Sequence, residues 1–247
     1  MSPSSAVEPK RTIESAVFIC GCGHSGTTLM ANMLAAHPDV YIPLRETEIF
    51  REEREAARVG YAELVAEAEA SDKRVLAEKT PKHIRRIGLI RELVPGARFL
   101  IVVRDGRDVA ASYGRRIGDP GHGVRQWIKS NSVSASQEEK DDVLVYRHED
   151  LIEDPTGTLT KICEFMSIPF DEGMLRYHEK ERNWFGLDGV GTPGESVRSN
   201  AKHRNWQVNQ PIFDNRGKWK SELTTNDFRE LLKGRGLRLM KRFGYLE

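Results

Sequence analysis

The chain has 247 residues, a length that indicates one large domain or two small ones. Hydrophobic residues make up 38% of it and charged residues 30%, which is the composition of a protein with an apolar core and excludes a disordered or fibrous chain. The formal net charge of +1 gives no support for broad binding to nucleic acid or to an anionic membrane.

The first fifteen residues are small and polar and contain no signal-peptide core, so residues 1–14 predict a flexible tail before one domain over residues 15–247. No apolar run reaches the roughly 18–20 residues that span a bilayer. The chain has three cysteines, too few for a disulfide framework, and we expect a cytoplasmic protein.

Short apolar runs predict buried strands that alternate with helices. Residues 16–20 form the first strand, and the following LMANMLAAH segment predicts a helix that Pro38 stops. A brief apolar piece at 40–42 precedes a charged, solvated helix over 52–70, in which Gly60 is a candidate break.

Residues 75–77 predict a third strand, and apolar side chains at helical spacing from His83 predict a helix that a Pro-Gly pair ends. Residues 98–103 (RFLIVV) form the clearest strand of the chain. Asp105 then provides an N-cap for a further helix.

Residues 118–142 are polar and show no clear pattern, whereas 143–147 (VLVYR) predict another strand. Pro155 suits the first turn of a helix. Residues 186–210 have little periodicity, which predicts a mobile loop or lid, and residues 226–243 predict a last helix.

Strands that alternate with helices indicate an α/β protein with a mainly parallel central sheet of about five strands flanked by helices. Ligands of such folds bind beyond the carboxyl ends of the strands. The segments that follow Cys20, Ile42, Glu78 and Val103 are therefore those in which we expect chemistry.

Gly21, Gly23 and Gly26 follow the first strand directly and precede a helix, an arrangement that surrounds a phosphate with backbone N–H groups. Their spacing is G-x-G-x-x-G, and Glu46 lies about 20 residues further on. This pattern supports an NAD(P)-dependent oxidoreductase as one hypothesis.

The same loop nearly fits the P-loop of nucleotide triphosphatases, but Thr27 stands where that motif needs lysine. The strand ending at Val103 is followed by Arg104 and not by a magnesium-binding aspartate. The loop is therefore expected to hold a phosphate without a metal.

Four segments, in order, resemble motifs of sulfotransferases that use 3′-phosphoadenosine 5′-phosphosulfate (PAPS). They are the 5′-phosphosulfate loop GCGHSGTTLM, the EKTPKH segment of carbohydrate-type enzymes, the 3′-phosphate motif RFLIVVRDGRDVAASY, and the closing loop DNRGKWKSEL. The resemblance implies a P-loop-like domain that moves a sulfuryl group from PAPS to an acceptor hydroxyl.

The resemblance also implies which residues bind the co-substrate. Arg104 and Ser112, together with Arg216 of the closing loop, are expected to hold the 3′-phosphate, and Gly217 lets the backbone approach. The residues expected at the 5′-phosphosulfate are Gly23, His24, Ser25, Gly26, Thr27 and Thr28.

Each of these roles has a plain alternative. Arg104 would otherwise form a surface ion pair with Asp105 or Asp108 beside an inert Ser112. Trp219 either stacks on adenine or belongs to the core.

Glu46 stands where carbohydrate-type enzymes carry a catalytic carboxylate, which accepts the proton of the acceptor hydroxyl. Glu48, two residues further on, competes for this role. We expect only one of them in the cleft, and the resemblance favours Glu46.

His24 stands where related loops carry a lysine or arginine that stabilises the leaving nucleotide. Histidine supplies either a cation or a neutral donor, and a nearby phosphosulfate would favour the charged form. Lys79 is the second candidate for this cation or for a contact to the acceptor; otherwise it is an exposed lysine before a helix.

The acceptor is expected to be a carbohydrate, a lipid or another small hydroxyl compound. Basic residues after the EKTP segment form either a rim for an acidic acceptor or a solvated helix face, and three later side chains are candidate acceptor contacts. These residues are Lys82, His83, Arg85 and Arg86, then Arg198, Arg204 and Trp206. A third hypothesis is a non-catalytic module that binds PAPS or its product, 3′-phosphoadenosine 5′-phosphate (PAP).

Overall fold

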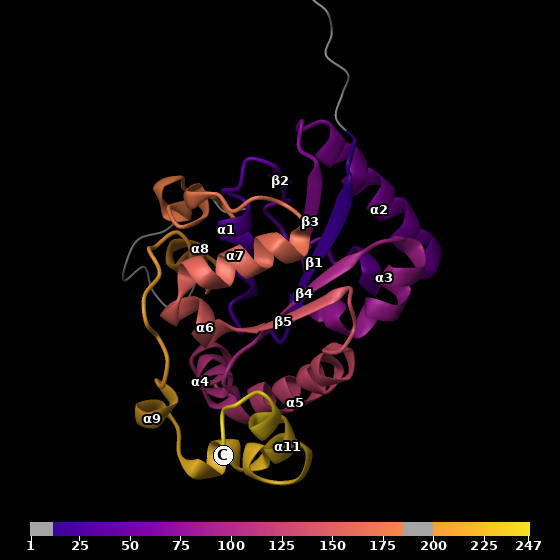
Figure 1. Cartoon of the computed structure of the whole chain (residues 1–247). Helices are drawn as coiled ribbons and strands as arrows, with labels where there is room; N and C mark the ends of the chain where they lie inside the picture. The colour runs from indigo at the N-terminus through magenta and orange to yellow at the C-terminus, as the bar shows by residue number, and fades with distance from the viewer. Residues whose placement is uncertain (1–11, 185–199) are drawn as a thin grey trace, which may run out of the picture.

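The computed structural model describes residues 12–184 and 200–247 (Figure 1). Most of the expected tail and the first part of the expected loop at 186–210 therefore lie outside the described residues. The described part contains a sheet of five parallel strands in the order β2-β3-β1-β4-β5. The strands are β1 Ser15–Gly21, β2 Val40–Tyr41, β3 Val75–Lys79, β4 Arg98–Val103 and β5 Val143–Arg147.

Helices cover both faces of this sheet. The α-helices are α1 Thr27–Leu34, α2 Arg54–Glu69, α3 Ile87–Leu93, α4 Gly106–Ile117, α5 Pro120–Gln137, α6 His148–Glu153, α7 Pro155–Met166, α8 Asn200–Val208, α9 Trp219–Glu222, α10 Thr225–Phe228 and α11 Gly234–Arg242. Short 3₁₀ helices are η1 Ile49–Arg51, η2 Pro81–Arg86, η3 Glu172–Met174, η4 Tyr177–Glu179 and η5 Arg229–Leu232.

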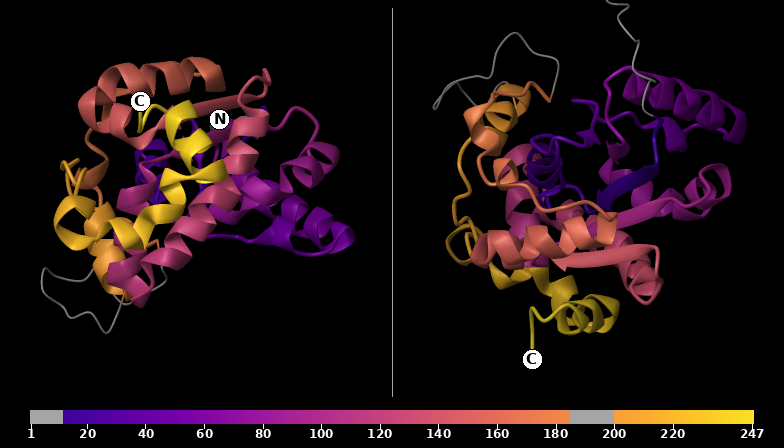
Figure 2. Two further views of the ribbon diagram at one scale, coloured as in Figure 1. Left: turned by 90° about the horizontal axis from the view of Figure 1, so that it is seen from below. Right: turned by 45° about the horizontal axis from the view of Figure 1, so that its top comes forward.

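Two apolar cores lie on the two faces because side chains of a strand alternate. In β1, Val17 and Ile19 pack with α1 and α7, whereas Phe18 and Cys20 pack with α3, α4 and α5. The C-terminal helix α11 joins the second group and packs against α5 (Figures 1 and 2). The predicted α/β class with a parallel central sheet is confirmed.

The sheet order separates this chain from the dinucleotide-binding fold. In that fold the second strand lies beside the first. Here β3 lies beside β1, and β2 is a two-residue strand at the edge. The NAD(P) hypothesis therefore lacks the strand that its glycine pattern requires.

Several predicted boundaries change. Gly60 is not a break, because α2 runs through it and packs it against Ile49. The segment from His83 is divided between η2 and α3, and residues 226–243 form three short helices. The polar segment 118–142 holds the long helix α5, and α8 occupies the end of the expected loop.

None of the helices in the described ranges is long and apolar enough to cross a membrane.

Candidate active site

A cavity of about 720 Å³ lies where the carboxyl ends of β1, β4 and β5 meet the segment that follows β2. Seven basic side chains and one carboxylate, that of Glu46, line it within the described residues. The seven are Lys82, Arg85, Arg104, Arg115, Arg116, Arg204 and Lys218. In a chain whose formal net charge is +1, this concentration of positive charge marks an anion site.

The glycine loop forms the floor of the cavity. A Cβ on Gly21 would lie 2.5 Å from the Val102 carbonyl oxygen, and one on Gly26 would lie 2.5 Å from His148 Nδ1. Only glycine fits these close approaches, and both positions also have positive φ angles. The loop therefore leads the N-terminus of α1, with Thr27 and Thr28, into the cavity, where unpaired N–H groups favour an anion.

Arg104, which follows β4, is buried in the cavity wall. Its Nη1 donates to the His24 carbonyl oxygen at 3.2 Å, its Nη2 donates to Asn215 Oδ1 at 3.1 Å, and its Nε has no partner among the described residues. Burial lowers the pKa of Arg104 below its usual value, and nearby carboxylates oppose that shift. A guanidinium with an unused N–H group in a basic cavity can bind a phosphate.

The alternative of a surface ion pair for Arg104 is wrong. Asp105 pairs with Arg107 at 2.6 Å, and Arg107 also donates to the Tyr245 carbonyl oxygen. Asp108 accepts the backbone N–H groups of Gly217 and Trp219. Neither carboxylate forms an ion pair with Arg104.

His24 has a φ of 68°, in the left-handed region that residues other than glycine rarely adopt. Its Nδ1 lies 2.8 Å from Ser112 Oγ, and Arg116 Nη1 donates to its Nε2 at 3.1 Å. Burial and the charges of Arg204 and Arg116 lower the pKa of His24 to about 3. In the free protein the ring is therefore neutral, and the Arg116 guanidinium beside it carries the positive charge.

Glu46 lines the cavity and accepts a hydrogen bond from Lys79 Nζ at 3.0 Å. Lys79 is the last residue of β3 and is fully buried, with Nζ 5.3 Å from the centre of the Trp184 ring. The alternative of an exposed lysine is wrong. Glu48 instead turns to the surface and pairs with Arg51.

In the closing loop, the residues that line the cavity differ from Arg216 and Gly217, which the motif predicts. Arg216 forms ion pairs with Asp214 and Glu153 and is absent from the lining among the described residues. Gly217 has a positive φ and gives its N–H group to Asp108. Asn215 and Lys218 are the residues of this loop that line the cavity.

Trp219 also points away from the cavity. The Arg107 guanidinium lies 4.2 Å from the centre of its ring, and Phe228 packs edge-on against it. In this structure the ring packs against side chains of α4 and α10.

Sequence reasoning missed His148, which lines the cavity directly after β5. Its side chain is buried, and burial beside Arg104 lowers its pKa to about 3. The position at a strand end would have identified it, because the same rule pointed to the segments after the other strands.

Some of the remaining candidate residues line the cavity and others do not. Arg204 lines the cavity, as do Lys82 and Arg85, whereas Arg198 lies outside the described residues. Ser25 is buried beneath the loop, and Trp206 is not part of the lining. Burial raises the pKa of Cys22 to about 12, so this thiol stays protonated and is no nucleophile.

Comparison with known proteins identifies similar chains. A family model described as "Sulfotransferase family" matches residues 16–64 and 45–172, and one described as "Sulfotransferase domain" matches residues 122–233. The protein-tyrosine sulfotransferase of Drosophila melanogaster is 26% identical over 87% of this chain and 49% of its own length. Protein-tyrosine sulfotransferase A of Caenorhabditis elegans is 29% identical over 73% of this chain and 57% of its own. The chain thus spans about half the length of these relatives.

Solved structures show the same fold. The sulfotransferase domain of the olefin synthase of Synechococcus PCC 7002 matches 96% of this chain and 97% of its own, with a TM-score of 0.60 and 20% identity. A mouse sulfotransferase complexed with PAP matches 94% of this chain and 85% of its own, with a TM-score of 0.58 and 14% identity.

Proposed function

The chain is an enzyme of the sulfotransferase family, and from this premise we propose that it transfers a sulfuryl group from PAPS to an acceptor hydroxyl. The observation that carries the proposal is Arg104, a buried guanidinium with a free Nε in the cavity wall, beside a glycine loop that leads into a helix N-terminus. These are two anion sites of different kind in one cavity, as a nucleotide with both a 3′-phosphate and a 5′-phosphosulfate requires.

The 5′-phosphosulfate is assigned to the loop of residues 23–28 and to the first N–H groups of α1. Arg104 is assigned to the 3′-phosphate. Lys218 and Asn215, which line the cavity, take the place that the motif gave to Arg216. Gly217 supports them by fixing the loop on Asp108. Ser112 acts through its hydrogen bond with His24.

In the reaction, the acceptor oxygen forms a bond to sulfur while the bond from sulfur to the bridging phosphate oxygen breaks, and PAP leaves. Glu46 accepts the acceptor proton, since it is the carboxylate of the described lining. His24 acts as a neutral hydrogen-bonding group, and Arg116 beside it stabilises negative charge that develops on the leaving phosphate. Lys79 acts on the reaction through Glu46, whose carboxylate it holds.

The acceptor is identified by a screen of several classes of hydroxyl compound. The relatives are protein-tyrosine sulfotransferases, so a tyrosine peptide is the first acceptor that we would assay. Carbohydrates, which the EKTP segment favours, form the next arm of the same screen, and lipids and other small hydroxyl compounds form the last.

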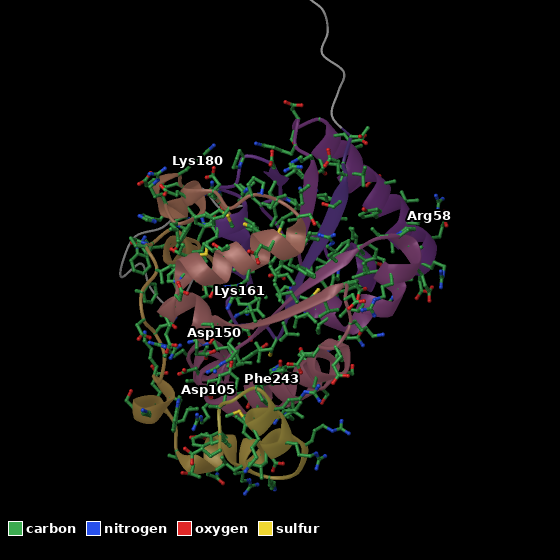
Figure 3. The ribbon with its side chains drawn as sticks, in the orientation of Figure 1. Arg58, Asp105, Asp150, Lys161, Lys180 and Phe243 are labelled. Atoms are coloured by element: carbon green, nitrogen blue, oxygen red, sulfur yellow. The ribbon has the colours of Figure 1, made fainter. Side chains whose placement is uncertain are left out.

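The co-substrate site is tested by calorimetric titration with PAP, 5′-AMP and NADH. We expect wild-type protein to prefer PAP over 5′-AMP and to bind no NADH. Arg104→Ala should weaken PAP binding about 100-fold, roughly 3 kcal/mol, and leave 5′-AMP binding nearly unchanged. Arg58→Ala, which removes an exposed guanidinium of α2 far from the cavity (Figure 3), is the control. Equal affinity for PAP and 5′-AMP in the wild type would contradict the proposal.

A further inference from the structure

Residues 78–80, at and directly after the end of β3, form hydrogen bonds with residues 46–48, the segment that carries the proposed base Glu46. A hydrogen bond joins the two segments at each of these positions. These bonds are Lys79 Nζ to Glu46 Oε1 at 3.0 Å, Thr47 Oγ1 to Glu78 Oε1 at 2.8 Å, and the Glu48 N–H group to Thr80 Oγ1 at 3.2 Å.

Glu78 is the centre of this arrangement. Its side chain is 1% exposed, and a buried carboxylate is destabilising unless donors surround it. Thr80 Oγ1 donates to it at 2.7 Å and His83 Nδ1 at 2.9 Å, in addition to Thr47. Burial raises the pKa of Glu78, but these hydrogen bonds outweigh burial and keep the pKa below its ordinary value. Glu78 is therefore an ionised, fully enclosed acceptor.

The enclosed carboxylate restricts the direction of its neighbours. Thr47 donates to Glu78, whereas the residue before it, Glu46, accepts from Lys79 and lines the cavity. With Thr47 fixed on Glu78, the neighbouring Glu46 side chain is kept at Lys79 and the cavity. At Glu48 the backbone has a φ of 53° and leaves the strand end. This strained conformation is retained while its N–H group is bound to Thr80.

We propose that Glu78 is a positioning residue which, through Thr47, directs the Glu46 carboxylate into the cavity. The proposal rests on the proposed function in one respect, the role of Glu46 as proton acceptor. Glu78 itself touches neither co-substrate nor acceptor, because it lies beneath the segment and outside the described cavity lining.

Thr47→Val tests the proposal because it removes one hydroxyl group and keeps the shape of the side chain. Glu78→Gln is the second variant, and Thr158→Val, which changes a buried threonine of α7, is the matched control. Hydrogen–deuterium exchange is followed in the segment 45–51. Transfer from PAPS to the tyrosine peptide is measured as separate kcat and KM values.

In Thr47→Val we expect faster exchange confined to this segment, a kcat reduced about tenfold to a hundredfold, and a KM for PAPS within about twofold of wild type. Glu78→Gln should change in the same direction. Exchange and kcat equal to those of Thr158→Val would overturn the proposal, as would faster exchange spread over the whole sheet. If wild-type protein transfers no sulfuryl group to any acceptor of the screen, the proposed function fails, and the exchange pattern still decides whether Glu78 orders the segment.

Discussion

His24 and His148 present uncharged rings to a cavity lined by arginine. The burial that keeps them neutral also couples their protonation to the free energy of unfolding. Each has a pKa lowered from 6.5 to about 3 by burial and neighbouring guanidinium groups. An unfolded chain binds protons at these positions near pH 6.5, whereas the folded chain does not until about pH 3. Their contribution to stability is therefore complete above pH 6.5 and is lost progressively as the pH falls toward 3.

This coupling is tested with His148→Gln, which keeps a polar side chain and removes the titration. At pH 5 the buried His148 should cost about 2 kcal/mol of the free energy of unfolding relative to pH 7. We expect the variant to lose correspondingly less stability between pH 7 and pH 5 in urea unfolding. Identical losses in the two proteins would show that His148 is not kept neutral by the fold.

Glu46 and Glu48 differ in what they face, although two positions separate them. Glu46 meets the cavity and Lys79, whereas Glu48 pairs with Arg51 at the surface. Glu46→Gln should therefore lower kcat by about 10²–10⁴-fold with PAP affinity unchanged, because a general base contributes about that much.

Glu48→Gln is the matched control for this change and should stay within about twofold of wild-type kcat. The measurement is sulfuryl transfer to the acceptor found in the screen, together with calorimetric titration with PAP. A Glu46→Gln variant with wild-type turnover would exclude a carboxylate base at this position.

Among the helices and strands, the sequence predicts the position of those that are marked by a run or a regular spacing of apolar residues. β4 and β5 occupy the predicted residues, because their apolar runs lie in the parallel sheet. Asp105 caps α4 as expected, accepting the Arg107 N–H group. These local signals place the glycine loop, Arg104 and Ser112 around one cavity before any tertiary contact is known.

Helices that pack through polar side chains were not predicted. In α5 the buried face includes Ser130, Asn131 and Ser134 beside Val124 and Trp127. The side chains of Asn131 and Ser134 donate to backbone carbonyl oxygens of the same helix, so polar residues interrupt the apolar pattern. In α8, Asn205 and Asn209 accept N–H groups from residues 182 and 184. Such docking depends on tertiary partners that a sequence pattern does not show.

In the closing loop, too, tertiary contacts that the sequence pattern does not show decide which side chains face the cavity. The motif indicates Arg216 as the basic side chain that faces the nucleotide, whereas in this structure long-range contacts leave Lys218 as the basic side chain of the loop in the described lining. Glu153 of α6 draws Arg216 outward, and Asp108 of α4 fixes the backbone at Gly217. Lys218 and Asn215 consequently line the cavity.

Over the whole molecule, the fold gathers basic side chains from several separate segments into one cavity, and this must be unfavourable while the cavity holds no anion. A ligand that neutralises them binds the folded chain alone and stabilises it by mass action.

At about 100 times its dissociation constant, PAP should add about 2.7 kcal/mol to the free energy of unfolding. For a chain of this length that corresponds to a rise in Tm of roughly 5–10 °C, measured by differential scanning calorimetry. At the same concentration, 5′-AMP should give a smaller rise, and Arg104→Ala should abolish the difference between the two nucleotides. Equal shifts by both nucleotides in the wild-type protein would mean that the basic cavity does not read the 3′-phosphate.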